Sequence, residues 1–121
     1  MLSIPAGVRI WLVAGLTDMR RSLDGLSALV QTQLSKDVLS GQMFIFRGRR
    51  GDRVKILWAD PEGMCLFYRR LNRGKFTWTH ASDGVVLLSP AQLSALLEGI
   101  DWRRVHRRVP TEGPAAPSVV A

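Results

Sequence analysis

Two short basic turns, each closing a run of residues with strand character, constrain the fold of this chain most strongly. The turns are Arg47–Arg53 and Arg69–Lys75, and together they hold eight of the 17 basic residues. The residues around each turn alternate between apolar and basic side chains, as half-buried strands do. Successive turns of an antiparallel meander alternate between the two ends of a sheet. The pattern therefore predicts that both basic turns project from the same end.

The other segments predict an α+β domain, a twisted antiparallel meander of five or six strands with helices packed on it. An amphipathic helix is expected over Met19–Leu34, capped by Thr17 or Asp18, because its apolar residues recur at helical spacing. A second, C-terminal helix is expected between Ser89 and Gly99, at one edge of the sheet. The expected strands are 8–13, 42–46, 53–59, 64–71, 75–79 and 85–88.

The length of 121 residues and the 46% share of apolar residues fit one globular domain with a modest core. We place that domain at residues 1–104. The remainder, residues 105–121, is basic and then Pro-rich, and is expected to be a disordered tail. Trp11, Trp58 and Trp78 lie in alternating strands and favour core packing, with stacking on exposed bases as the alternative. Trp102 is expected to pin the end of the domain.

The charge points to a polyanionic partner. The net charge is +7, and arginine supplies 14 of the 17 basic residues. Arginine binds phosphate through two parallel hydrogen bonds, which favours nucleic acid over a membrane surface. A genome rich in G and C would explain the excess of arginine over lysine, but not the net charge. The apolar start is interrupted by Pro5 and Arg9, so neither a signal peptide nor a membrane span is expected. The expected location is the bacterial cytoplasm, with association with the nucleoid open.

The candidate nucleic-acid site is the set of basic side chains in and beside the two turns. The alternative is that charged hairpin turns only keep the sheet edges soluble. Two such turns at one end, together with the net charge, favour binding of DNA through its phosphates. The predicted contact residues are Arg47, Arg49, Arg50, Arg53, Lys55, Arg69, Arg70, Arg73 and Lys75.

No pattern predicts an enzyme, a metal site or a cofactor. No phosphate-binding loop or nucleophile elbow is present, and Cys65 lies in an apolar run that favours a buried structural thiol. His80 and His106 are isolated in sequence, which favours solvated histidines over ligands or a general base. The turn and cap aspartates each have a structural explanation; they are Asp18, Asp24, Asp52, Asp60 and Asp83. We therefore expect no catalytic residue and no cofactor.

Taken together, these segments resemble the TnpB (Orf2) accessory proteins of the insertion sequence 66 family of bacterial transposons, over about residues 4 to 104. The combination is more specific than any single motif. Where the family often has Trp-Pro, this chain has Trp78-Thr79, which leaves only the local turn in doubt. The matching stretches are GVRIWL from Gly7, TDMRR from Thr17, DGL from Asp24, FIFRGRRGD from Phe44, KILW from Lys55, the run from Cys65 to Phe76, and LEGIDW from Leu97.

The resemblance implies a non-catalytic accessory role in transposition, beside a separate transposase that carries the catalytic acids. It also implies that the transposase and other proteins of the same element are partners. We expect the arginine-rich end to contact transposon-end DNA, and the apolar edge or C-terminal helix to contact the transposase. Two alternatives stay open. The first is a protein–protein adaptor of the transposase that does not bind DNA directly. The second is a small nuclease that acts through His80 and nearby acids.

Overall fold

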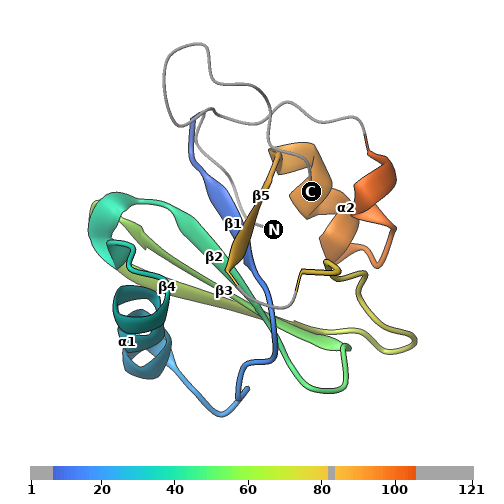
Figure 1. Ribbon diagram of the computed structural model, residues 1–121, viewed down its shortest axis with the longest axis horizontal. Helices are drawn as coiled ribbons and strands as arrows, with labels where there is room; N and C mark the ends of the chain where they lie inside the picture. The colour runs from blue at the N-terminus through green and yellow to red at the C-terminus, as the bar shows by residue number, and fades with distance from the viewer. Residues whose placement is uncertain (1–6, 82–83, 106–121) are drawn as a thin grey trace.

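The computed structural model describes residues 7–81 and 84–105, which form one mixed sheet with a helix on each face (Figure 1). The predicted α+β class is confirmed. The elements, in chain order, are β1 (Ile10–Val13), α1 (Leu23–Gln33), the 3₁₀ helix η1 (Val38–Ser40), β2 (Met43–Arg47), β3 (Arg53–Asp60), β4 (Gly63–Arg70), β5 (Val85–Leu88), α2 (Pro90–Leu97) and the 3₁₀ helix η2 (Trp102–Arg104).

The sheet has the strand order β4-β3-β2-β1-β5. The predicted meander is present in β2, β3 and β4, which are antiparallel neighbours. The sheet as a whole is mixed rather than antiparallel, because β1 runs parallel to β2 and antiparallel to β5. The long connection through α1 makes the parallel pairing of β1 and β2 possible, since parallel strands need a crossover. The central strands β1 and β2 are almost wholly buried, whereas β4 at one edge is only half-buried.

The two helices bury opposite faces of the sheet. Leu26, Leu29 and Val30 of α1 pack with Phe44 and other residues of one sheet face. On the other face, the apolar residues of α2 join Ile45, Ile56 and Trp102 in a second cluster. The strict alternation of β3 feeds both clusters, because Val54 and Ile56 face α2 while Leu57 faces α1.

Helix α1 begins at Leu23, four residues later than the expected start at Met19. The preceding residues form a separate turn, in which the backbone N–H of Arg20 donates to Asp18 Oδ1 and that of Arg21 to Asp18 O. The carbonyls of Met19 and Arg21 accept hydrogen bonds from Lys55 instead of from helical amides. Asp18 therefore caps a turn rather than the helix, and Thr17 is buried beside it.

Residues 75–79 do not form the expected strand. Gly74 has a positive φ of 76°, and the chain beyond it crosses the β2–β3 turn. There the N–H of Phe76 donates to Gly51 O at 2.8 Å, and Thr77 O accepts the indole N–H of Trp102 at 2.6 Å. These bonds replace the ladder of a strand. Phe76 is buried, while Trp78 packs half-buried against the same cluster.

Helix α2 matches its sequence signals, but it covers one face of the sheet instead of lying at the expected edge. Ser89 and Gln92 form a capping box, with Pro90 in the first turn. At the other end, Gly99 takes a φ of 77° and the N–H of Ile100 reaches back to Ala95 O. Trp102 is fully buried, as its expected role in pinning the domain end requires. The predicted disordered tail falls almost entirely on residues 106–121, outside the described residues.

Candidate nucleic-acid interface

Three segments meet at one end of the sheet, and two of them are the basic turns. The turn 48–52 joins β2 to β3, and residues 71–75 follow β4, so both leave the sheet at the same end. The prediction that the basic turns share an end is confirmed. The third segment is the 14–22 loop, which follows β1. Because β1 and β2 are parallel, the loop leaves β1 at the same end of the sheet at which the turn 48–52 leaves β2. We call this the basic end.

Backbone hydrogen bonds tie the three segments to one another. The N–H of Thr17 donates to Arg47 O at 2.9 Å, which fastens the 14–22 loop to β2. The N–H of Leu71 donates to Asp52 O at 2.9 Å, which fastens the segment after β4 to the turn 48–52. The charged side chains therefore stand on backbone segments that are tied together, and segments that are already ordered lose less entropy on binding than independent loops.

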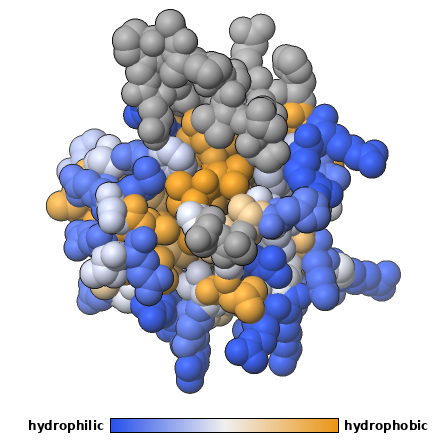
Figure 2. Space-filling view, in the orientation of Figure 1, coloured by the Kyte–Doolittle hydropathy of each residue, from blue (hydrophilic) through white to orange (hydrophobic). Residues whose placement is uncertain are grey.

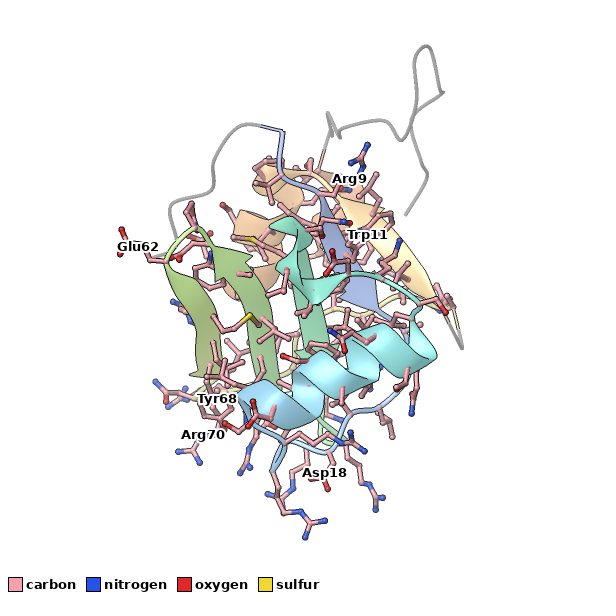
Figure 3. The ribbon with its side chains drawn as sticks, turned by 90° about the vertical axis from the view of Figure 1, so that its left-hand side faces the viewer. Arg9, Trp11, Asp18, Glu62, Tyr68 and Arg70 are labelled. Atoms are coloured by element: carbon pink, nitrogen blue, oxygen red, sulfur yellow. The ribbon has the colours of Figure 1, made fainter. Side chains whose placement is uncertain are left out.

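Five of the nine predicted contact residues project freely from these segments. They are exposed, and none of their charged groups makes an ion pair within the described residues. Long hydrophilic side chains fringe the lower edge of the molecule in Figure 2, where Figure 1 places the loops of the basic end. Figure 3 shows Arg70 at this end of β4, with the acidic Glu62 at the other. The five residues are Arg49, Arg50, Arg70, Arg73 and Lys75.

Four other predicted contact residues are half-buried, and three of them have clear intramolecular partners. Lys55 Nζ donates to Met19 O and Arg21 O, both at 2.7 Å. Arg69 donates to Leu97 O at 2.8 Å, at the last turn of α2. The guanidinium of Arg47 lies 5.3 Å from the ring centroid of Trp78. These three side chains hold segments of the basic end in place. The fourth, Arg53, lines a groove.

A groove of about 570 Å³ opens between the 14–22 loop and the turn 48–52. Arg53 forms part of its wall, and its Nε is buried without a hydrogen-bond partner among the described residues. Arg20 and the neighbouring Arg21 are not among the predicted contact residues, because both fall within the helix expected over Met19–Leu34. The groove is lined by Leu16, Thr17, Asp18, Met19, Arg20, Gly48, Arg49, Arg50 and Arg53.

Asp18 is the one acidic side chain in that lining. It pairs with Arg20, whose Nη2 lies 2.8 Å from Asp18 Oδ2. The hydrogen bond from the Arg20 side chain lowers the pKa of Asp18 to about 2, with help from the Arg20 backbone N–H. Asp18 is therefore ionised at neutral pH and neutralises Arg20 in part. The positive potential of the groove comes mainly from the three arginines of the β2–β3 region.

Two glycines give the turn 48–52 its shape. Gly51 has a φ of 77°, where a side chain is strained, and its carbonyl accepts the bond from Phe76. A Cβ atom at Gly48 would lie 2.7 Å from Met19 Cγ, closer than packing allows. Glycine at these two positions thus lets the turn approach both neighbouring segments.

Replacing Lys55 by Met is expected to lower the free energy of unfolding by about 2 kcal/mol. Two hydrogen bonds from an ammonium group are lost, each of the charge-assisted kind, in a half-buried setting that weakens them. Urea unfolding measures the change. Lys75→Met is the matched control, because Lys75 is exposed and its ammonium makes no hydrogen bond in the described part of the chain. Equal losses in the two variants would refute the anchoring role of Lys55.

Those of the remaining candidate groups that lie in the described residues do not converge on a catalytic centre. Cys65 is half-buried, not buried as expected, and desolvation together with Asp60 raises the pKa of its thiol. His80 is exposed, and its Nε2 lies 2.9 Å from Arg103 Nη1. His106 and Asp83 lie outside the described residues. In residues 7–81 and 84–105, no three His, Cys, Asp or Glu side chains are grouped to hold a metal.

We expect the purified protein, given magnesium or manganese, neither to cleave nor to join DNA. Two-metal strand transfer needs a grouped set of acids, and the resemblance to the TnpB (Orf2) accessory proteins implies that a separate transposase carries them. Incubation with supercoiled plasmid measures nicking directly. Metal-dependent nicking that disappears in a folded His80→Ala or Asp→Asn variant would overturn the expectation.

The described helices include none with the length and apolar character needed to cross a membrane.

A family model described as "IS66 Orf2 like protein" matches residues 8–107. Two uncharacterized proteins of Sinorhizobium fredii (strain NBRC 101917 / NGR234) are similar to the chain. Protein y4hO is 49% identical over 102 residues, covering 83% of this chain and 89% of its own length. Protein y4jC is 38% identical over 108 residues, covering 89% and 92%.

No solved structure matches the chain. The family model nevertheless spans every strand and helix described above, including all nine predicted contact residues and the loop that carries Arg20 and Arg21. Because this family model covers most of the chain, the chain belongs to the IS66 Orf2-like family.

Proposed function

We propose that this protein is a non-catalytic accessory factor for transposition whose basic end binds the phosphate backbone of transposon-end DNA. Membership of the IS66 Orf2-like family supports the accessory role in transposition. The DNA contact is inferred from the molecule itself. The observation that carries it is the convergence of both basic turns and the Arg20–Arg21 loop at one end of the sheet.

The kind of contact follows from the elements involved. The basic side chains of this end stand on loops, turns and strands, and none of them lies on α1 or α2, so none is carried by a helix that could enter a major groove. Turn arginines reach phosphate oxygens, which position a protein on DNA without reading its sequence. We therefore propose that binding is largely independent of sequence.

The groove suits a DNA strand in a further respect. Leu16 is 58% exposed, and with Met19 it gives one side of the groove an apolar surface. Arg49 and Arg50 give the other side two exposed charges. A sugar–phosphate backbone presents both kinds of surface, whereas an acidic protein patch presents mainly charge. This combination favours DNA over the adaptor function.

A salt titration of DNA binding tests the proposal. Each neutralised phosphate contributes about 0.9 to the slope of log affinity against log salt. Contacts by the five exposed residues would therefore give a slope of about −4 to −5, with duplexes of unrelated sequence bound alike. No retention on DNA at any salt concentration, with retention of the transposase, would instead establish the adaptor function.

A further inference from the structure

Strand β4 leaves a long sheet edge without a partner strand. It has eight residues and pairs on one side with β3, from Asp60↔Gly63 to Arg53↔Arg70. Among the described residues no strand pairs with its other side, and Figure 3 shows it as the outermost strand. The opposite edge strand, β5, has only four residues. Long free edges are templates for pairing with another chain, and proteins usually shorten or cover them.

The side chains along β4 are apolar in the middle and charged at the two ends. Met64, Leu66 and Phe67 are half-buried, and Tyr68 is 49% exposed. The strand follows an acidic turn and finishes in two arginines at the basic end. The edge is therefore a charge dipole with an apolar centre.

We propose that a second copy of this chain pairs with β4 edge to edge and antiparallel, which makes the protein a dimer with twofold symmetry. Antiparallel pairing places the basic end of each β4 opposite the acidic turn of the other copy, whereas parallel pairing would place like charges together. This charge complementarity selects the second copy as the occupant, since the same edge supplies both signs. Such a self-complementary patch is what a twofold interface requires.

The register follows from the two faces of the sheet. Residues directly opposite in an antiparallel pair lie on the same face, so even-numbered residues of β4 must meet even-numbered ones. A register centred on Leu66 places Leu66 opposite its own copy, Met64 opposite Tyr68, and Glu62 opposite Arg70. Centring on Phe67 would place Arg70 opposite Met64 and leave the charges unpaired. The register centred on Leu66 is therefore the one that joins the charges over a long overlap.

The dimer would matter for DNA binding. Because the two β4 strands run antiparallel, the two basic ends face in opposite directions along the joined sheet. Two DNA segments would then be held by one dimer. This consequence rests on the proposed function, whereas the dimer itself does not, and the tests below contain no DNA.

A charge exchange tests the interface. Arg70→Glu and Glu62→Arg each place like charges opposite one another in both symmetric pairs, and each is expected to weaken dimerisation about tenfold at low salt. The double variant restores the pairs and should recover the affinity of the original protein. Glu62 and Arg70 lie at opposite ends of one β4, roughly 27 Å apart for a strand of this length. The double variant can therefore recover the dimer affinity only through contacts between the two copies of the chain.

Sedimentation equilibrium of the full chain gives the dissociation constant of each variant. A cross-linking experiment checks the register independently. In a Cys65→Ser background, Leu66→Cys should give a covalent dimer with a short thiol-specific cross-linker, because the two side chains are neighbours at the twofold axis. Ser94→Cys, exposed on α2, is the matched control and should stay monomeric under denaturing conditions.

A monomer at every concentration would overturn the proposal. A dimer unaffected by either single charge change, or a double variant as weak as the single ones, would also overturn it. Efficient cross-linking of the Ser94 control with none at Leu66 would place the dimer contact elsewhere and refute the β4 edge.

Discussion

Replacing Arg49 and Arg50 together by alanine is expected to weaken DNA binding about 60-fold at about 0.1 M salt, equally for all sequences. The two guanidinium groups are exposed, line one groove and have no ion-pair partner within the described residues. Losing two phosphate contacts reduces the slope of log affinity against log salt by about 1.8. Over one decade of salt, that change in slope corresponds to the expected loss. Fluorescence anisotropy over a salt series measures both quantities.

The control removes the same charge from another part of the chain. Replacing Arg103 and Arg104 together by alanine also lowers the net charge by two. Both arginines lie on η2 and pair with Asp101, outside the basic end. This pair should leave the slope nearly unchanged. The Arg49/Arg50 variant should keep its stability within about 0.5 kcal/mol, since exposed turn residues contribute little. A loss confined to one DNA sequence would indicate base recognition and contradict phosphate binding.

Replacing Trp102 by alanine is expected to lower the free energy of unfolding by about 3 to 5 kcal/mol. Trp102 is fully buried in the cluster between the sheet and α2. Its indole N–H also holds the carbonyl of Thr77, next to the segment that carries Phe76 and Lys75. Such a loss is a large fraction of the stability of a small domain. Chemical denaturation, with the folded state checked by circular dichroism, measures it.

Trp102→Phe separates packing from hydrogen bonding. Phenylalanine fills much of the same space but leaves Thr77 O without its donor, so a smaller loss of about 1 to 2 kcal/mol is expected. If alanine at position 102 cost no more than a surface substitution, the placement of η2 against the sheet would be wrong.

Much of the fold could be predicted because local patterns determine it. The turn around Pro61, the strict alternation of β3 and the Ser89–Pro90 start of α2 depend on neighbours in sequence, and all three are present in the structure. The partners of β1 depend instead on a long crossover that no local pattern specifies. The strand expected at 75–79 fails for a similar reason, since its backbone bonds go to Gly51 and Trp102.

The candidate site divides in the same way. The shared end of the two basic turns could be predicted, because it follows from the alternation of turns in a meander. The anchoring role of Lys55 could not be predicted, since it depends on carbonyls 34 and 36 residues away. Arg20 is missing from the predicted contact residues because Asp18 gives a strong helix-cap signal, which places Arg20 in the expected helix. The turn closed by Asp18 and the hydrogen bonds from Lys55 to the loop go with the later start of the helix.

Hydrogen exchange of the full chain with and without a DNA duplex tests the central claim most directly, because it locates the contact without any substitution. We predict slower exchange, on addition of DNA at low salt, in the 14–22 loop, the turn 48–52 and residues 71–75. The protection should disappear when salt is raised. Protection confined to α2 and β5, or protection that persists at high salt, would contradict DNA binding by the basic end.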